Sequence, residues 1–194
     1  MESFETLLHE AEAAHGHLCA GQILGVRMAM LGCRLLGIDD PRGKDRKRLV
    51  TYVEIDRCAT DAIAVVTGCR LGKRALKFRD WGKMAATFAD LQGKAIRIAA
   101  LESSKQRARE LYPEMGDKNQ QQMRAYREMP DADLFSTRWV SVTVEPREMP
   151  GYKSTRIVCA QCGEGINYDR EVHLDGQILC YPCAHPQDRY FQPV

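Results

Sequence analysis

The sequence predicts an α+β protein in which helices pack on a mostly antiparallel sheet. Helical and strand-like segments do not alternate regularly along the chain, as they would in a doubly wound fold. Apolar residues make up 44% of the 194 residues and charged residues 28%, as in soluble globular proteins with one sizeable core. A cysteine-rich end, separated from the rest by a stretch with two prolines and a glycine, predicts a small second domain.

Two helices are expected at the start of the chain. Apolar residues recur at helical spacing over residues 4–14, and Ser3 is a suitable N-cap. Residues 22–36 also have helical spacing, and Gly37 provides a natural end. This second helix is apolar on more than one face, so we expect it to be buried on several sides, in a core or across a subunit boundary.

The strands are predicted by alternating and β-branched residues. Residues 49–55 form one expected strand, and residues 138–145 form the last one. Residues 83–89 and 94–101 predict a hairpin whose turn lies at residues 90–93.

Short helices are expected between and after these strands. Thr60 is a good N-cap for a helix that ends at Gly68, which places Cys58 at a strand end just before this helix. Residues 103–111 and 117–129 predict two more helices, the second ended by a proline.

The stretch from His15 to Cys19 carries three possible metal ligands at alternate positions, the third side chain being His17. An extended backbone would turn all three side chains to one side, whereas a helix would bring only His15 and Cys19 together. Unpaired N–H groups at the start of the following helix favour a thiolate. The pattern indicates a metal or reactive-thiol site, and the alternative is a turn with chance histidines and a buried cysteine.

We expect His17 and Cys19 to bind a first-row transition metal, Zn²⁺, Ni²⁺ or Fe²⁺. Thiolate with imidazole suits these ions and argues against Mg²⁺ or Ca²⁺. His15 and Cys58 are the next candidates, as ligands or as partners of the ligands. The weaker candidates are Cys69, which can be a packing residue, and Asp61, which can simply complement a helix dipole.

Four late cysteines have the spacing C-x2-C-x17-C-x2-C, namely Cys159, Cys162, Cys180 and Cys183. This spacing suits a tetrahedral, structural Zn²⁺ site with four thiolates. A redox dithiol pair or an unrelated set of cysteines is the alternative. His173 and His185 are expected to be surface residues, because four cysteines already fill the coordination sphere.

The zinc motif defines the expected domain organisation. Residues 1–148 should form the α+β core and residues 149–194 a four-cysteine zinc finger. A module of this size buries too little surface to fold unaided, so the metal must supply folding energy.

Charge and hydropathy restrict the functional classes. The net charge of +2 does not favour a nucleic-acid surface, and no apolar run approaches the roughly 20 residues that span a bilayer. The acidic first residues lack a signal-peptide pattern, so we expect a cytoplasmic protein without a membrane partner. Eight cysteines in that compartment point to metal or redox chemistry before disulfides. The glycine-rich, basic residues 68–74 form either an anion-binding nest or an ordinary turn.

Four segments together resemble the FmdE-like family of formylmethanofuran dehydrogenase subunits. They are residues 15–21, 58–63, 67–73 and 80–88. The resemblance implies an α+β core, an intertwined homodimer and a metal site near the His-x-Cys segment, and the C-terminal finger resembles an extension that some members carry. Family motifs usually have Pro at Ala20 and Thr at Arg70, differences that leave the metal ligands intact.

The resemblance implies a metal-binding accessory or regulatory protein around molybdenum or tungsten enzymes of one-carbon, anaerobic metabolism. The chain itself shows no pterin site and no ferredoxin-like cysteine run. One alternative is a metal-dependent or thiol enzyme at the core site, with Asp56 or Asp61 as acid or base. Another is a zinc-finger regulator that binds nucleic acid or protein, although the finger is not strongly basic.

Overall fold

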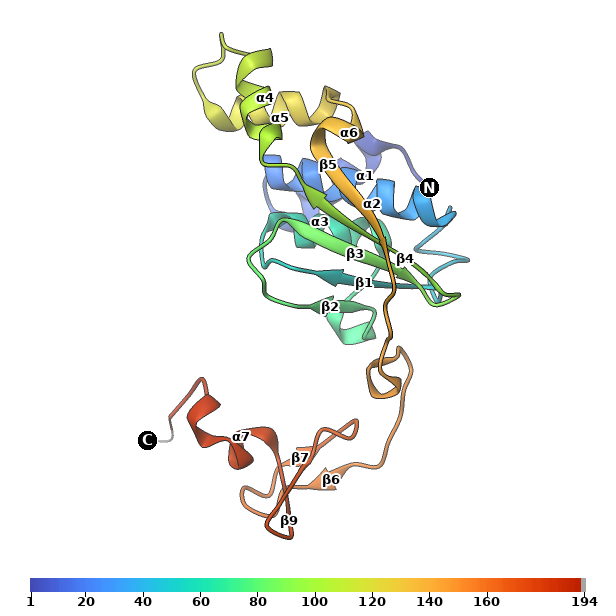
Figure 1. The fold of residues 1–194 in the computed structure, drawn as a ribbon, viewed down its shortest axis with the longest axis vertical. Helices are drawn as coiled ribbons and strands as arrows, with labels where there is room; N and C mark the ends of the chain where they lie inside the picture. Colours follow the sequence, from blue (N-terminus) through green and yellow to red (C-terminus); the bar gives the residue numbers. More distant parts are fainter. Residues whose placement is uncertain (193–194) are drawn as a thin grey trace. The chain divides into compact units, whose positions relative to one another are not determined.

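The computed structural model describes residues 1–192 and divides into two compact units, Met1–Thr143 and a second unit that begins at Val144. The first unit contains a five-stranded sheet in the order β2-β1-β3-β4-β5 (Figure 1). β1 and β2 are parallel, and the other three pairs are antiparallel, which confirms the expected fold class. The strands are β1 (Leu49–Val53), β2 (Leu76–Phe78), β3 (Ala85–Asp90), β4 (Lys94–Ala100) and β5 (Phe135–Val140).

Three helices cover one face of this sheet (Figure 1). α2 (Ala20–Leu36) contacts β3 and β4, and it also packs against α1 (Phe4–His15) and α3 (Cys58–Thr67). α2 is buried on several sides, as its apolar pattern predicts, so this helix forms the centre of the core. Between β4 and β5 the chain forms α4 (Ser103–Leu111), α5 (Lys118–Glu128) and α6 (Asp131–Leu134).

Two glycines of α2 explain how closely this helix can pack. A Cβ atom at Gly25 would lie 2.5 Å from the carbonyl oxygen and 2.8 Å from the Cα of Ala59 in α3. A Cβ atom at Gly32 would lie 2.4 Å from the ring of Phe88 in β3. The absence of side chains at these two positions therefore lets α2 touch both the backbone of α3 and the sheet.

The expected N-terminal helix and hairpin are confirmed. Ser3 caps α1, because its Oγ accepts a hydrogen bond from the backbone N–H of Thr6 at 3.2 Å. The turn between β3 and β4 contains Gly93 in the left-handed region, with φ of +111°. Glycine adopts this conformation at no steric cost, so it ends the turn at the position expected from the sequence.

Three boundaries differ from expectation. α3 begins at Cys58, and Thr60 does not cap it, because its hydroxyl donates to the carbonyl of Ile55 at 2.5 Å. β5 covers residues 135–140 and not 138–145: Val140 pairs with Ala95 near the start of β4, so the partner strand ends there. β2 was not predicted, since three residues are too few to show an alternating pattern.

The second unit contains short elements around a small core. They are η2 (Pro146–Glu148), β6 (Ile157–Val158), β7 (Gly165–Ile166), β8 (Val172–Leu174), β9 (Gln177–Leu179), α7 (Tyr181–Ala184) and η3 (Pro186–Asp188). β6 pairs with β7 and β8 with β9, both antiparallel. The buried apolar cluster of this unit consists of Ile166 and Leu179 beside two cysteines. So few buried side chains cannot offset the entropy of folding, so the unit requires another source of stability.

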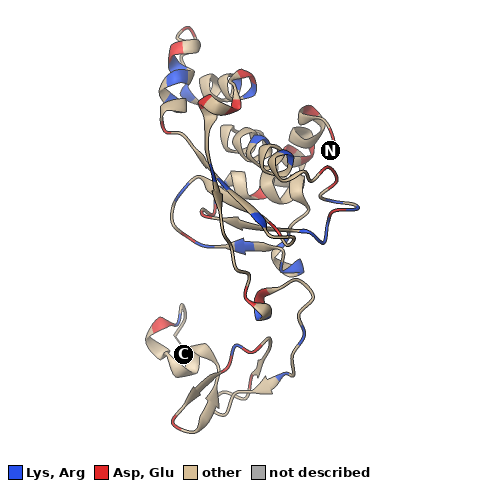
Figure 2. Ribbon diagram, turned by 45° about the vertical axis from the view of Figure 1, so that its right-hand side comes forward, with Lys and Arg blue, Asp and Glu red and all other residues tan. Residues whose placement is uncertain are grey.

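Charges of both signs are interspersed over the surface. Figure 2 shows basic and acidic segments side by side in the α4–α5 region, where Arg107 pairs with Glu110 and Arg124 with Glu128. Such pairs are typical of solvated helices and do not build a basic face. Among the described residues, no helix is both long and apolar enough to cross a membrane.

The contact between α2 and α3 predicts the effect of a small substitution. Gly25→Ala should lower the free energy of unfolding by roughly 1–3 kcal/mol, because the new methyl group meets backbone atoms of Ala59 that cannot rotate away. This cost exceeds the roughly 1 kcal/mol that alanine gains over glycine in a helix. Urea unfolding measures the difference. Gly116→Ala is the control, because a Cβ atom there has no neighbour within 4 Å. Equal midpoints for the two variants would contradict the close contact.

Candidate metal centres

The first candidate centre is formed where α1 ends and α2 begins. α1 ends at His15, and Gly16 turns the chain through the left-handed region, with φ of +94°. Cys19 then has an extended backbone and is the N-cap of α2. The segment is therefore neither extended nor helical throughout. The turn brings the rings of His15 and His17 to 4.7 Å between centroids, and one ligand atom from each of these and Cys19 lies within 4.8 Å of the others.

Cys58 borders this group from the start of α3. A Cβ atom at Gly21 would lie 3.2 Å from the Cβ of Cys58 and 3.7 Å from the Sγ of Cys19, so the two cysteines flank the same glycine. The thiol of Cys58 also hydrogen-bonds to Cys19. The buried side chain of Gln22 donates from Nε2 to the carbonyl oxygen of Cys58 at 2.8 Å. The structure thus brings the fourth expected residue to the edge of the histidine–cysteine group, and Gln22, which sequence reasoning missed, fixes its backbone.

The two neighbouring thiols oppose each other's ionisation. Burial raises the pKa of the Cys58 thiol, and the adjacent Cys19 raises it further. These effects outweigh the helix dipole, which the sequence suggested would favour a thiolate at this position. A divalent cation between the two sulfurs would reverse the balance, since a coordinating thiol is deprotonated. The pair is therefore a better metal site than a free nucleophile.

Asp61 orients one of the histidines. Its Oδ2 lies 2.8 Å from the Nδ1 of His15, and an ionised carboxylate can only accept a hydrogen bond. Nδ1 therefore carries the proton, and Nε2 of His15 keeps a lone pair for a metal ion. Metal-binding histidines commonly donate their other N–H to a carboxylate in this way. The sequence offered Asp61 as a weak ligand candidate, and the structure places it as the partner of a candidate ligand.

Cys69 lies in the core, away from this group. It is 3% exposed and accepts a hydrogen bond from the hydroxyl of Thr51 at 3.5 Å. Cys33 is also buried, and burial together with the nearby Cys69 raises the pKa of its thiol to about 12. Both thiols are therefore protonated packing residues at neutral pH. The glycine-rich residues that follow Cys69 form the short helix η1 (Leu71–Lys73).

A cavity of about 450 Å³ adjoins the first centre. It has a polar side, which includes residues of the candidate centre, and an apolar side. Two of its residues, His15 and Cys58, belong to the expected ligand set. The lining residues are His15, Val53, Asp56, Arg57, Cys58, Thr60, Asp61, Leu71, Leu76 and Phe78.

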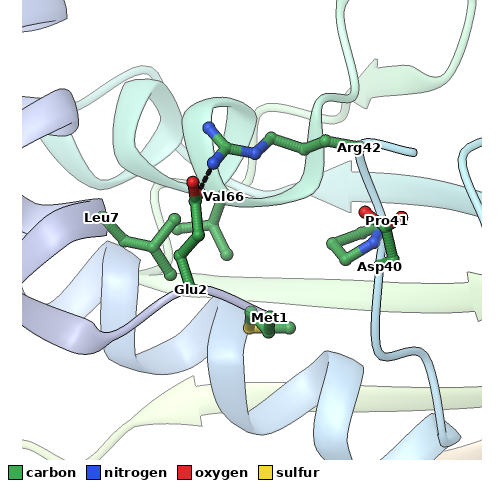
Figure 3. A pocket seen from close by; sticks show the side chains of 7 residues that line it. All are labelled: Met1, Glu2, Leu7, Asp40, Pro41, Arg42 and Val66. Atoms are coloured by element: carbon green, nitrogen blue, oxygen red, sulfur yellow. Dashed lines mark ion pairs between the residues drawn. The ribbon is translucent and has the colours of Figure 1, made fainter.

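A second cavity, of about 350 Å³, lies beside the N-terminus of the chain (Figure 3). Arg42 reaches across it and forms an ion pair with Glu2, drawn in Figure 3, and a further pair with Glu10. The guanidinium charge is thus already neutralised by carboxylates of the same chain. The lining contains neither cysteine nor histidine, so this cavity offers no metal site.

The second candidate centre is the group of four late cysteines. Their Sγ atoms all lie within 4.8 Å of one another, and those of Cys162 and Cys180 are 3.8 Å apart. Zn–S bonds of about 2.3 Å place the sulfurs of a tetrahedral site about 3.8 Å apart, so the geometry fits zinc. Backbone N–H groups, of Cys162 first and then of Cys180, lower the pKa of the Cys159 thiol to about 6.

The two histidines of this unit are not among the grouped ligands. His173 is exposed on β8, and the ring of His185 stacks on that of Tyr181 at 4.4 Å. The four-cysteine group is therefore complete without them and leaves no position open. Such a closed zinc site is structural.

The fold and the donor groups together define an α+β protein with a histidine–cysteine group in its core and a C4 zinc finger. The family model described as "FmdE, Molybdenum formylmethanofuran dehydrogenase operon" matches residues 14–136, and the chain belongs to this family. A model for the prokaryotic DksA/TraR C4-type zinc finger matches residues 152–189. The resemblance seen in the sequence is thereby confirmed.

Two similar proteins extend this comparison. A protein of Archaeoglobus fulgidus named "Probable S-adenosyl-L-methionine-binding protein" is 36% identical over 94 residues, which cover 47% of this chain. The chain spans about a quarter (26%) of the length of that relative. The crystal structure of an FmdE-like protein of tungsten formylmethanofuran dehydrogenase, from Syntrophus aciditrophicus, has a TM-score of 0.65 and 20% identity. That match covers 97% of this chain and 95% of the other, and it shows a shared fold.

The four-cysteine centre predicts a local effect of ligand loss. Cys180→Ala should remove one zinc ion per chain and open the second unit to proteolysis, because that unit has almost no apolar core of its own. The first unit should keep its unfolding midpoint. Metal analysis and limited proteolysis test this, with His173→Ala as the control. Full zinc content in Cys180→Ala would contradict the assignment.

Proposed function

We propose that the core site binds one first-row transition metal ion through His17 and Cys19, with His15 and Cys58 as the remaining ligands or their closest partners. The observation that carries this proposal is the convergence of three ligand atoms within 4.8 Å, with the Cys58 thiol beside them. Imidazole and thiolate together suit Zn²⁺, Ni²⁺ or Fe²⁺. An ion at this position would also join the ends of three helices.

The protein's role would be that of an accessory or regulatory metal-binding protein of molybdenum or tungsten one-carbon enzymes in anaerobic metabolism. Membership of the FmdE family supports this, as does the closed, structural finger. The first unit would sense or deliver the metal, and the finger would contact a protein partner. The name of the Archaeoglobus relative does not extend this proposal, since the match covers 26% of that protein.

A metal-dependent enzyme is the second candidate. The cavity favours it, because His15 and Cys58 belong both to the expected ligand set and to the cavity wall. Fewer than four protein ligands would leave a coordination position for water or substrate. Asp56, which also lines the cavity, would then be the available acid or base. A finger that binds nucleic acid is a weaker candidate, because neither the sequence nor the surface provides a basic face.

We further propose a cytoplasmic homodimer. The eight cysteines are all free thiols, which agrees with a reducing compartment. β5 is an edge strand that pairs only with β4 within residues 1–192, and Trp139 on this strand is 57% exposed. Unpaired edges and exposed aromatic side chains are features that a second copy can cover.

Metal stoichiometry tests the core site. The full-length protein, purified anaerobically without a nickel column, should hold two metal ions per chain, one in each centre. Cys19→Ser should hold one, whereas Asp61→Asn should keep two but bind the core ion roughly 10–100-fold more weakly, since its side chain no longer orients His15 as a carboxylate does. His9→Ala is the control, because His9 is exposed on α1 and lies outside both centres.

A spectroscopic version separates the two sites. In a full-length variant with all four finger cysteines replaced by alanine, Co²⁺ should give thiolate charge-transfer bands that disappear on Cys19→Ser. If this variant binds no Co²⁺ under anaerobic conditions, the stretch from His15 to Cys19 is structural and the proposed core site is wrong.

Light scattering tests the assembly. The full-length protein should have twice the chain mass of 21.9 kDa at micromolar concentration. Trp139→Lys should shift the equilibrium toward monomer, because a charge at an exposed edge strand opposes pairing. Trp81→Lys, at another exposed tryptophan outside the strands, is the matched control. A wild-type monomer would rule out the dimer.

A further inference from the structure

The cavity beside the core site lies at a characteristic position in the sheet. β1, α3 and β2 form a crossover unit, in which two neighbouring parallel strands are joined through a helix. On its other side β1 pairs with the antiparallel β3. Val53 and Phe78, which pair in register at the carboxyl ends of β1 and β2, both line the cavity. In open sheets with such crossovers, ligands bind outside the carboxyl ends of the parallel strands.

The cavity has two chemically different sides. One side carries His15, Cys58 and Arg57, of which the first two are expected metal ligands. The other side is apolar and includes Leu71 from η1 and Phe78 from β2. The volume of about 450 Å³ falls in the range of small-molecule sites, which combine apolar walls with a few convergent polar groups.

The apolar side is not explained by the folding of the core. Leu71 is 65% exposed and Phe78 is 39% exposed, and neither belongs to the buried apolar cluster of the first unit. Large apolar side chains that face a cavity and remain in water gain free energy when a ligand covers them. Their replacement should also cost little stability, which makes them suitable test positions.

We propose that this cavity binds a small amphipathic compound, with an oxygen-bearing head group directed to the core metal and an apolar body against Leu71 and Phe78. The inference rests on the proposed function, because the head group needs the metal ion. The apolar side then determines which compounds are accepted: a ligand with a ring or alkyl body is bound more tightly than one with the same head group alone.

Two hydroxamates are suitable probes, because they share a metal-binding head and differ in their bodies. Acetohydroxamate carries a methyl group, and phenylacetohydroxamate carries a benzyl group. Both are titrated into the full-length, zinc-loaded protein by calorimetry, and the metal content is measured before and after. Phenylacetohydroxamate should bind about tenfold more tightly, since a few extra buried carbon atoms produce discrimination of this order.

Variants locate the two ends of the ligand. Leu71→Ser and Phe78→Ala should each reduce the preference for phenylacetohydroxamate to about threefold or less, while the affinity for acetohydroxamate stays unchanged. Leu111→Ser is the matched control, because Leu111 is 41% exposed on α4 and does not line the cavity. Cys19→Ser, which removes the core metal and leaves the finger zinc, should abolish binding of both compounds.

The outcomes distinguish this inference from the proposed function. Equal affinities for the two hydroxamates, or a preference that Leu71→Ser and Phe78→Ala leave unchanged, would overturn the cavity assignment while the metal site stands. A core metal that binds neither compound would show that it has no open position, and would overturn the inference alone. Absence of a core metal in the initial analysis would refute the proposed function, and the inference with it.

Discussion

The close packing of α2 on α3 is the contact on which the core site depends. At Gly25 the backbone of α2 meets that of α3, where a methyl group would already overlap with Ala59. One turn earlier, Gly21 lies between Cys19 and Cys58. Because the two helices touch along this glycine edge, their N-termini start side by side, and the thiols at those two starts become neighbours. Two cysteines separated by 38 intervening positions thus meet through a missing side chain, and no sequence motif links them directly.

This origin explains which parts of the site could be predicted. The group from His15 to Cys19 and the four late cysteines are local, so their spacing in the sequence already indicates metal binding. Cys58 could be proposed only because it precedes a helix, and the cap of that helix was expected two residues late, at Thr60. The partnership of Asp61 with His15 joins α3 to α1 and depends on how the helices pack. Gln22 carries no signal in the sequence that separates a helical glutamine from one that fixes a distant carbonyl.

The same distinction between local and long-range information applies to the fold. Helix caps and the β3–β4 turn are local and were predicted at Ser3 and Gly93. β2 and the end of β5 are set by partner strands. β2 is three residues long and exists because β1 offers it a parallel edge, and β5 stops where β4 begins. The cavity beside the core site results from the first of these pairings, so it could not be foreseen without the sheet order.

The two centres differ in how they use their ligands. The finger has four sulfurs at nearly tetrahedral spacing and little else to hold its short strands together, so its ion replaces a hydrophobic core. The first unit already has a large core, with α2 buried throughout, and does not need an ion in order to fold. Its ligand groups nevertheless converge where three helices end or begin and where a cavity opens. A site that the fold does not require, placed beside a cavity with an exposed apolar side, is better explained by binding than by stability.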